Sequence, residues 1–517
     1  MSLVPIGKIV AVGVFVASFF HLATGSTLAV VRSVPAQYST IQAALDAAAT
    51  GDTVLVAPGT YGTDTSGITL TISKQITVAA ETYDQQNPKN NNVHIIGKVE
   101  ARGGTAWDYD KGPVVRGVHI FADDPIRGYN TPYTLEYSFI EAAGIGTDGL
   151  LFAQNSDGVS FEAHGGVVRG NVIQPAGDDC IDLDNQTKDI LIENNVLTDC
   201  NQDAIEVRQH DTTISQRVTL TIRNNRIGPT GQDGLQIMDY ANFTNRRYVL
   251  ERNLFIGAGT GKNIQNPSSP PGRNNGAAIG IMVGQDTTES YSAAAMPEPL
   301  YAINNIFINN DAGISGGGNL IAINNIFSGN SVFDLKNVTG NTTTGGTSKV
   351  MNTLFATTPI PLQGTNNIET ASTITGNPLL DANYMLQSGS PAIDAGRAFY
   401  QHTYTDPGGT SITDMVLNLT AGQYNGAAPD LGWKEAGGVQ TTPTHSPTRT
   451  PTRTPSPTPS CGPSGDINCD YSIDLTDLVT LLSNFGRSGM TKQQGDVDGN
   501  GDINLSDLTA LLTNFGR

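Results

Sequence analysis

The chain contains few aromatic residues and little charge. Aromatic side chains make up 7% of the 517 residues and charged side chains 15%, whereas glycine occurs 58 times. A composition poor in aromatics and rich in glycine is typical of a turn-rich all-β protein rather than of a helical one. The length also allows more than one domain.

Basic residues are scarce relative to acidic ones. Lys and Arg number 29 against 48 Asp and Glu, which gives a net charge of −19. This charge argues against nucleic acid or an anionic membrane surface as the partner. A polyanionic substrate stays compatible with it, because bound calcium or a local basic patch reverses the sign of the charge at a site.

Long apolar runs are also scarce, and the one that occurs lies at residues 9–20, after Lys8 and before Ala23-Thr24-Gly25. It is too short to span a bilayer comfortably. A basic residue, an apolar core and then small residues are typical of a secretory signal peptide. We therefore expect residues 1–25 to be removed and the mature protein to be exported, with no membrane span.

The chain has only four cysteines, which suits an exported protein that uses few disulfides. Cys461 and Cys469 lie close together in the sequence, and we expect them to pair. Cys180 and Cys200 lie on adjacent repeats of the pattern described next, but they differ in phase by four positions. The sequence leaves their pairing open.

Three segments between Gly165 and Asp239 repeat one another: VVRGNVIQPAGDDCIDLD, ILIENNVLTDCNQDAIEVR and LTIRNNRIGPTGQDGLQIM. Each has an asparagine, then an aspartate eight residues later, then an alternating strand pattern; the pairs are Asn171 and Asp179, Asn195 and Asp203, and Asn225 and Asp233. Self-similarity at a short period indicates a solenoid whose turns bury one continuous core. We predict a parallel β-helix over residues 34–435, with these asparagines stacked in one turn.

Alternation assigns the side chains of these strands to two faces, because successive side chains point to opposite sides. The inward set is Ile181, Leu183, Ile205, Val207, Leu235 and Ile237, and the outward set is Cys180, Asp182, Asp184, Ala204, Glu206, Arg208, Gly234, Gln236 and Met238. Rungs of a parallel solenoid lie about 4.8 Å apart, so Asp182 should neighbour Glu206, and Asp184 should neighbour Arg208. Stacked carboxylates need a cation or a shared proton, which makes this acidic row the candidate site.

The segment 34–61 predicts a short helix, Ile41–Ala49, capped by Ser39 or Thr40, and then a strand, Thr53–Ala57. This pattern resembles the entry cap of right-handed parallel β-helix proteins, the pectin-lyase-like group. Residues 383–397 and 428–435 resemble the closing segment of bacterial β-helix proteins. The resemblance implies an all-β fold, a right-handed parallel β-helix with an N-terminal capping helix.

Two families of this fold share motifs with the acidic row. Gly177-Asp-Asp-Cys180 and Asn155-Ser-Asp-Gly158 resemble elements of polygalacturonases, whose later histidine-containing and Arg-x-Lys motifs are absent here. Either Asp148-Gly-Leu-Leu-Phe or Asp157-Gly-Val-Ser-Phe can supply the strand of the preceding rung. The segment GDDCIDLD also resembles the acidic segment of calcium-dependent pectate lyases.

The lyase resemblance implies a site in which acids on adjacent rungs hold Ca²⁺ and a basic residue removes a proton beside a uronate carboxylate. The acids in this position are Asp178, Asp179, Asp182, Asp203 and Glu206, with Asp184 beside them, and the candidate bases are Arg208 and Lys188. We therefore predict a calcium-dependent lyase of a polyuronate such as pectate. The alternatives are a polygalacturonase-like hydrolase and a glycan-binding or cell-surface protein without catalysis.

Residues 440–460 form a Pro/Thr/Ser-rich linker, and two similar segments, 465–487 and 495–517, follow it. Oxygen-bearing residues at loop positions 1, 3, 5, 9 and 12, with a carbonyl at position 7, form a cage that suits Ca²⁺. The first loop supplies Asp466, Asn468, Asp470, Ser472, Asp474 and Asp477, and the second Asp496, Asp498, Asn500, Asp502, Asn504 and Asp507.

This doubled loop–helix pattern behind a linker resembles a type I dockerin. The resemblance implies a small α-helical domain at residues 461–517 with paired EF-hand-like calcium loops. It also implies a cohesin on a scaffold or cell surface as the partner, chosen with the help of Leu475, Thr476, Leu505 and Ser506. Tyr471 stands at the position where the second loop has Gly501, which is a departure from the pattern that favours glycine at a sharp turn.

Overall fold

A computed structural model describes most of the chain, which divides into two compact units, residues 1–444 and 445–517. The described residues are 29–63, 67–142, 156–162, 164–209, 214–239, 243–260, 276–283, 296–339, 348–357, 362–364, 368–406, 408–420, 422–437, 467, 475–487, 491–498 and 500–514. The expected signal peptide, the linker and the expected pair of Cys461 and Cys469 lie outside these residues. Within them, no helix is long and apolar enough to cross a membrane.

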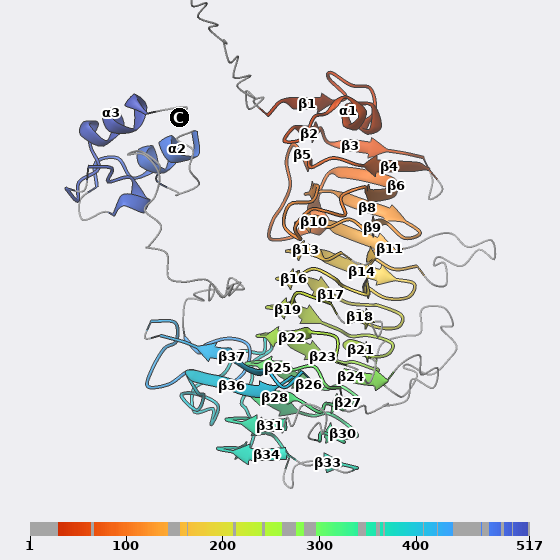
Figure 1. Ribbon diagram of the computed structural model, residues 1–517, viewed down its shortest axis with the longest axis vertical. Helices are drawn as coiled ribbons and strands as arrows, with labels where there is room; N and C mark the ends of the chain where they lie inside the picture. Colours follow the sequence, from red (N-terminus) through yellow and green to blue (C-terminus); the bar gives the residue numbers. More distant parts are fainter. Residues whose placement is uncertain are drawn as a thin grey trace, which may run out of the picture. The chain divides into compact units, whose positions relative to one another are not determined.

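The first unit is a parallel β-helix, in which the chain visits three sheets in turn and stacks each strand on the one a rung earlier (Figure 1). Sheet A has 13 parallel strands. They are β1 (Val31–Val34), β2 (Thr53–Val56), β5 (Thr77–Ala80), β7 (Val114–Arg116), β10 (Tyr133–Glu136), β13 (Gly166–Arg169), β16 (Ile190–Glu193), β19 (Val218–Arg223), β22 (Arg246–Glu251), β25 (Leu300–Ile303), β28 (Leu320–Ile323), β31 (Ser348–Met351) and β34 (Ile368–Ala371).

The other strands form sheets B and C, which the long strand β6 (Val93–Arg102) joins because its first half pairs in B and its second half in C. Sheet B also contains β3 (Gly59–Tyr61), β8 (His119–Ala122), β11 (Phe139–Ala142), β14 (Val172–Ala176), β17 (Val196–Leu197), β20 (Arg226–Ile227), β23 (Leu254–Ile256), β26 (Ile306–Ile308), β29 (Ile326–Ser328), β32 (Leu354–Phe355) and β35 (Ile374–Thr375). Sheet C contains β4 (Ile68–Ile72), β9 (Ile126–Tyr129), β12 (Val159–Glu162), β15 (Ile181–Asp184), β18 (Ile205–Arg208), β21 (Leu235–Asp239), β24 (Ala277–Val283), β27 (Ala312–Ser315), β30 (Phe333–Lys336) and β33 (Leu362–Gln363).

Helix α1 (Ile41–Ala47) covers the first rung, as the sequence predicts. The side chain of Thr40 accepts a hydrogen bond from the backbone N–H of Ala43, which caps the helix. Ile41 and Leu45 are buried in the same core as the strands. The helix thereby closes the open apolar end of the stack, where unpaired strand edges would otherwise face water.

The rungs end at β35, so the chain after residue 375 does not continue the β-helix as far as residue 435. It packs instead on the outside, where β36 (Phe399–Thr405) and β37 (Ser411–Asn418) form an antiparallel hairpin. Val416 and Leu417 pack on Tyr301 of sheet A. Asp414 accepts a hydrogen bond from the Tyr301 hydroxyl and forms ion pairs with two arginines of the β-helix. The hairpin therefore covers part of the outer surface of sheet A and does not add a rung to the β-helix.

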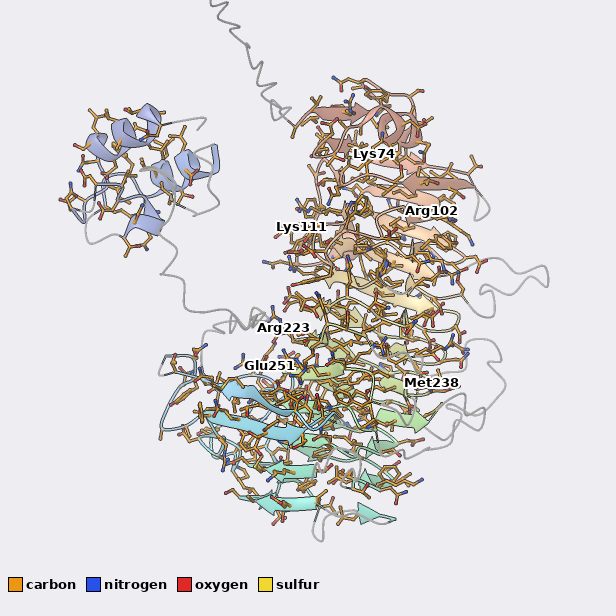
Figure 2. All side chains as sticks on the ribbon, viewed as in Figure 1. Lys74, Arg102, Lys111, Arg223, Met238 and Glu251 are labelled. Carbon is orange, nitrogen blue, oxygen red and sulfur yellow. A yellow bond between two sulfur atoms is a disulfide. The ribbon has the colours of Figure 1, made fainter. Side chains whose placement is uncertain are left out.

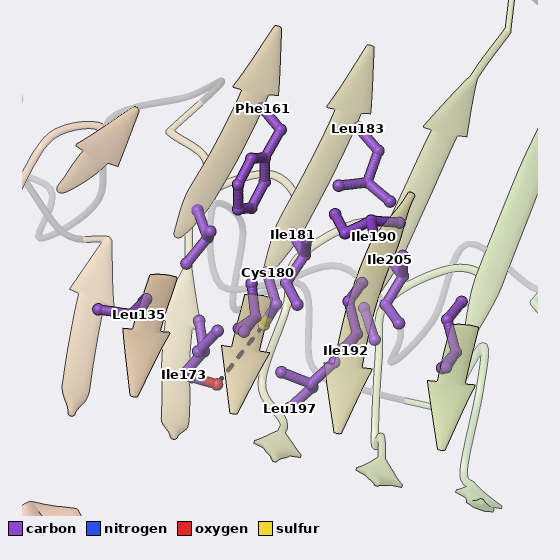
Figure 3. Close-up of a cluster of buried hydrophobic side chains, with 14 of the residues drawn as sticks. Leu135, Phe161, Ile173, Cys180, Ile181, Leu183, Ile190, Ile192, Leu197 and Ile205 are labelled. Carbon is purple, nitrogen blue, oxygen red and sulfur yellow. Dashed lines mark hydrogen bonds between the residues drawn. The ribbon is translucent and has the colours of Figure 1, made fainter. Parts of the chain in front are cut away.

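The core of the β-helix is continuous from rung to rung (Figure 3). The six side chains predicted to point inward are fully buried there: Ile181, Leu183, Ile205, Val207, Leu235 and Ile237. Side chains of one position stack along the axis, and the rings of Phe307 and Phe327 lie 4.6 Å apart between centroids. Each rung therefore buries apolar surface only because its neighbours cover it.

Alternation predicts outward side chains for Cys180, Ala204 and Gly234, and this prediction is wrong. Cys180 and Ala204 are fully buried in the core, and a Cβ on Gly234 would lie 2.8 Å from the carbonyl oxygen of Ala278. The three residues directly precede the strands, in a turn to which the alternation of strands does not apply. Because Cys180 points inward, its sulfur meets that of Cys200 in a disulfide, with the Cα atoms 5.4 Å apart.

Removing this disulfide should destabilise the β-helix. We expect the double variant Cys180→Ser, Cys200→Ser to lose about 3 kcal/mol, because the bond closes a loop of roughly twenty residues in the unfolded chain. Urea denaturation of the variant and the wild type, under the same calcium concentration, measures the difference. An unchanged midpoint would show that stacking alone holds these two rungs together.

The predicted stack of asparagines is confirmed. Oδ1 of Asn195 accepts hydrogen bonds from the backbone N–H and the side-chain amide of Asn171, at 2.9 and 3.0 Å. The same pair of bonds links each member to the next along Asn171, Asn195, Asn225, Asn253, Asn305 and Asn325. We call this set the asparagine ladder. It satisfies polar groups buried between rungs, as buried amides require.

The residue before each ladder asparagine explains the recurring Asn-Asn pairs of the sequence. Asn194, Asn224, Asn304 and Asn324 all have φ between 54° and 59°. Asparagine adopts this left-handed conformation more readily than most residues, and Gly170 serves at the first ladder position. In each Asn-Asn pair, the first residue thus makes the sharp turn and the second belongs to the asparagine ladder.

The second unit is small and helical. It contains α2 (Leu475–Ser483) and α3 (Leu505–Thr513), and the short 3-10 helix η2 (Lys492–Gln494) lies between them. Another 3-10 helix, η1 (Pro88–Asn90), lies between β5 and β6 in the first unit. Its core consists of Ile467, Leu481, Val497, Ile503 and Leu511. Asn504 caps α3, and Asp507 bonds back to the backbone of Asn504. The two helices occur where the duplicated pattern predicts them.

Candidate functional site

Two rows of outward side chains run along sheet C. In register they are Glu100, Arg127, Ser160, Asp182, Glu206 and Gln236, and then Arg102, Tyr129, Glu162, Asp184, Arg208 and Met238. Figure 2 shows Arg102 and Met238, the ends of the second row, on the same side of the β-helix, with Arg223 and Glu251 of sheet A on the other. Asp182 faces Glu206 and Asp184 faces Arg208, as predicted.

The two central acids of the first row are buried although they point away from the core. Asp182 is 5% exposed and Glu206 is 4% exposed. Oδ1 of Asp182 meets no hydrogen-bond donor among the described residues. A buried carboxylate oxygen without a donor costs free energy unless a proton or a cation compensates it.

A second line of acids precedes the strands of sheet C. The backbone N–H of Asp203 donates to Oδ1 of Asp179 at 2.8 Å, and that of Asp233 donates to Oδ1 of Asp203 at 2.6 Å. The same bond links Asp157 to Asp124 and, at 3.4 Å, Asp179 to Asp157. These aspartates form an aspartate ladder, which parallels the asparagine ladder but carries titratable groups.

The two lines meet at a cluster of four acids, which we call the acidic cluster: Asp157, Asp178, Asp179 and Asp182. One carboxylate oxygen from each of Asp157, Asp178 and Asp179 lies within 4.8 Å of the other two. The turn before β15 supplies Asp178 and Asp179, and the residue two positions before β12 is Asp157. The structure thus shows that Asp157-Gly-Val-Ser-Phe supplies the rung; Asp148 lies outside the described residues.

The acidic cluster is electrostatically unfavourable without a partner. Burial raises the pKa of Asp157 to about 7, and the charges of Asp178 and Asp124 add to the shift. Burial also raises the pKa of Asp182 well above its usual value, and Asp157 is the largest of the charges that add to it. A bound cation would replace the protons that these groups otherwise retain.

Glu206 connects the acidic cluster to a base candidate. Burial raises the pKa of Asp179, and the charge of Glu206 and a hydrogen bond to it add to that shift. On its other side, Glu206 accepts two hydrogen bonds from the guanidinium of Arg208, at 2.9 and 2.6 Å. Burial works to lower the pKa of Arg208, but Glu206 and Asp182 outweigh it and leave the pKa raised.

The remaining residues expected in the site lie around its edge. Asp203 belongs to the aspartate ladder one rung further on, where burial and then the charge of Asp233 raise its pKa. Asp184 ends β15, and Lys188 lies beyond it in the turn that leads to β16, whereas the acidic cluster lies at the other end of β15. Asp157 is a cluster member that was not predicted for the site, although it belongs to the Asn155-Ser-Asp-Gly158 motif.

The second loop of the C-terminal unit forms a second group of acids. One oxygen from each of Asp496, Asp498 and Asp507 lies within 4.8 Å of the others. Oδ2 of Asp496 accepts the backbone N–H of Gly501, whose φ of 87° makes the sharp turn. Asp507 accepts the N–H of Val497, and Asp477 accepts that of Ile467 in the matching way. Asp466, Asn468, Asp470, Ser472 and Asp474 of the first loop lie outside the described residues.

Several solved structures resemble this chain at low identity. Pectate lyase Pel9A is 14% identical, with 80% of this chain and 98% of that chain covered and a TM-score of 0.42. A PL6 alginate lyase in complex with a trisaccharide is 14% identical, with 68% and 86% covered and a TM-score of 0.35. The A-module of mannuronan C-5 epimerase AlgE6 from Azotobacter vinelandii is 13% identical, with 65% and 94% covered and a TM-score of 0.35. These values describe a likeness of fold alone.

Comparison of the sequence with curated proteins found no match. A family model described as "Right handed beta helix region" matches residues 134–255. This part of the chain contains the whole acidic cluster, the first four members of the asparagine ladder and the pair of Glu206 and Arg208. The right-handed parallel β-helix predicted from the repeats and the entry cap is therefore confirmed.

Proposed function

We propose that the chain is an exported, calcium-dependent lyase of a polyuronate such as pectate, tethered through a dockerin to a cohesin. The observation that carries the enzymatic part is the acidic cluster, in which carboxylate oxygens of Asp157, Asp178 and Asp179 converge and act together with the buried Asp182. The guanidinium of Arg208 pairs with Glu206, and its charge also acts on Asp182 of the cluster.

The residues present suit calcium. Ca²⁺ takes six to eight oxygen ligands in flexible geometry, many of them carboxylates. Asp157, Asp178 and Asp179 supply a group of such oxygens, and Oδ1 of the neighbouring Asp182 has no donor from any described residue. Asp203 and Glu206 stand one rung further on as additional oxygen donors. Bound there, calcium would hold a uronate carboxylate and make the adjacent C–H more acidic.

Whether Arg208 can remove that proton depends on its ion pair with Glu206. Of the two candidate bases, Arg208 is the one whose charge acts on the pKa of Asp182, but its own raised pKa keeps it charged while Glu206 holds it. A turn of Glu206 toward the cation would release the guanidinium and lower its pKa. Lys188, in the turn after β15, is the second candidate base. In the paired state, Arg208 serves to attract a substrate carboxylate.

The test is incubation with polyuronates and neutral polysaccharides, with calcium and with chelator. We expect unsaturated products from a polyuronate only when calcium is present, because β-elimination leaves a double bond and hydrolysis does not. Arg208→Ala should lose turnover while calcium binding persists, and Arg208→Lys should recover part of the rate. Saturated products that form equally well in chelator would contradict the proposal.

Two other outcomes identify the alternatives. Saturated products in the presence of chelator indicate hydrolysis by paired carboxyl groups such as Asp179 and Asp182, which the raised pKa values would suit as proton donors. Retention on one polysaccharide without any turnover indicates a glycan-binding protein. In that case Asp182→Ala and Glu206→Ala should both change retention.

For the C-terminal unit we propose calcium binding by both loops and docking to a cohesin. The group of Asp496, Asp498 and Asp507 supports it, as does the matching contact of Asp477. Leu505 is 68% exposed at the start of α3, where a partner could contact it. Leu475, Thr476 and Ser506 would complete the set that selects the cohesin.

The double variant Asp496→Ala, Asp507→Ala should bind one calcium ion fewer than the wild type. Without the cage oxygens the second loop loses its ligands, and the remaining acids repel one another. Titration calorimetry of the full chain counts the ions, and scanning calorimetry should show a transition of the C-terminal unit that chelator shifts to lower temperature. Full stoichiometry in the variant would contradict the assignment.

A further inference from the structure

Sheet B carries a cluster of histidines on its outer face, away from the acidic cluster of sheet C. His94 of β6 and His119 of β8 are register partners, and their Nδ1 atoms lie 2.9 Å apart. Nε2 of His119 contacts a carboxylate oxygen of Glu141 on β11. The rigid stacking of three adjacent rungs therefore holds two imidazoles and a carboxylate together, although 25 and 22 residues separate them.

The contact with Glu141 determines which nitrogen of His119 carries a proton. A carboxylate only accepts, so Nε2 of His119 must be the N–H that donates to it. In a neutral imidazole the other nitrogen, Nδ1, then presents a lone pair. Nδ1 of His94 lies 2.9 Å from this nitrogen. A carboxylate that orients a histidine through its far nitrogen is the usual support of a metal-binding histidine.

We propose that Nδ1 of His94 and Nδ1 of His119 bind one late first-row transition-metal ion, with Cu²⁺ preferred over Zn²⁺. Imidazole nitrogens bind such ions at about 2.0–2.1 Å, so two of them at right angles lie about 2.9 Å apart. That separation is the one observed. Right-angled nitrogen pairs suit the tetragonal geometry of Cu²⁺, and Cu²⁺ also leads the order of affinities.

The surroundings hold the pair in place and leave one side open. The ring of Phe139 packs on that of His119, with the centroids 4.6 Å apart, and Nζ of Lys89 lies 5.6 Å from the centroid of the Phe139 ring. The side chain of His119 is 18% exposed and that of Glu141 is 26% exposed. An ion therefore has access from solvent, and water or a small ligand can complete its coordination.

The experiment uses the full chain, stripped of metals and then supplied with millimolar calcium to occupy the carboxylate sites. Titration with Cu²⁺ should show a site of one ion, and electron paramagnetic resonance at one equivalent should show coupling to two imidazole nitrogens. His94→Gln and His119→Gln should each weaken binding at least tenfold, and Glu141→Gln should weaken it about 10–100-fold. His164→Gln is the matched control, since His164 bonds to Thr187 elsewhere, and it should change nothing.

Two results would overturn the proposal. One is no uptake of Cu²⁺ or Zn²⁺ above that of the double variant His94→Gln, His119→Gln, which would make the pair a hydrogen bond with a shared proton. The other is a two-nitrogen signal that persists in that double variant, which would place the ion at other histidines. Glu141 is not a proposed ligand, so Glu141→Gln tests the orienting role separately. Unchanged affinity for Cu²⁺ in this variant would contradict that role. This test stands even if a histidine variant fails to fold.

Discussion

Replacing Asp182 with asparagine is expected to lower polyuronate turnover by at least about a hundredfold and to remove the stabilisation that calcium gives to the β-helix. The substitution keeps the shape of the side chain but removes the charge of a buried carboxylate whose Oδ1 has no donor from any described residue. The calcium-free variant should be more stable than the calcium-free wild type near neutral pH, because folding forces Asp182 to take up a proton or to carry a buried charge, whereas asparagine does neither.

Asp334→Asn is the matched control for this substitution. Asp334 lies on β30, farther along sheet C, and burial raises its pKa to about 6. It accepts a hydrogen bond from Asn330, which an asparagine oxygen also accepts. Rates of formation of unsaturated product and unfolding midpoints, each with calcium and with chelator, make the comparison. Full activity in Asp182→Asn, or an equal loss in Asp334→Asn, would remove the acidic cluster from the mechanism.

The same cluster predicts a pH dependence of stability. The pKa of Asp157 is 3.8 in the unfolded reference and about 7 in the folded protein. Between these values the folded state binds more protons than the unfolded state, so stability falls as the pH rises. The shifts of Asp179, Asp182 and Asp203 have the same direction. Urea denaturation across this range in chelator should show the decrease, and calcium should flatten it; a rise would contradict the assignment.

The second large effect is expected at Asn225 in the asparagine ladder. Asn225→Ala should cost about 4 kcal/mol, because each buried donor or acceptor that loses its partner costs about 1–3 kcal/mol. The substitution removes two bonds that Oδ1 accepts from Asn195 and two that Nδ2 donates, to Ile192 and to Asn253. Asn225 is fully buried, so water does not replace them.

Asn330→Ala tests whether burial causes that loss. Asn330 makes the same four kinds of bond, accepting two from Asn310 and donating to Phe307 and to Asp334. It is only half-buried, so water can reach the groups that it leaves. We expect less than half the loss seen at Asn225 in urea denaturation. Equal losses at Asn225 and Asn330 would mean that burial of the unpaired groups does not cause the loss.

The features that the sequence predicts correctly are those that repeat. The in-register Asn171, Asn195 and Asn225 predict a stack of rungs, because a ladder residue must recur wherever a rung recurs. Inward side chains such as Ile205 follow from strand alternation alone. Helix α1 and the helices of the C-terminal unit follow from local caps and periodic leucines. Each of these depends on interactions within a helix, within a rung or between neighbouring rungs, which a local or repeating pattern records.

Where the repeating pattern of the rungs is interrupted, the positions and contacts of side chains depend on the tertiary structure. Cys180 lies at a corner, so its inward turn and its bond to Cys200 do not follow from alternation. Asp157 joins the acidic cluster across an irregular spacing, and the burial of Asp182 and Glu206 depends on packing outside the strand itself. The meeting of His94 with His119 and Glu141 likewise depends on register between unlike rungs. The pKa values of buried acids arise from summed distances and desolvation in space, which no linear spacing encodes.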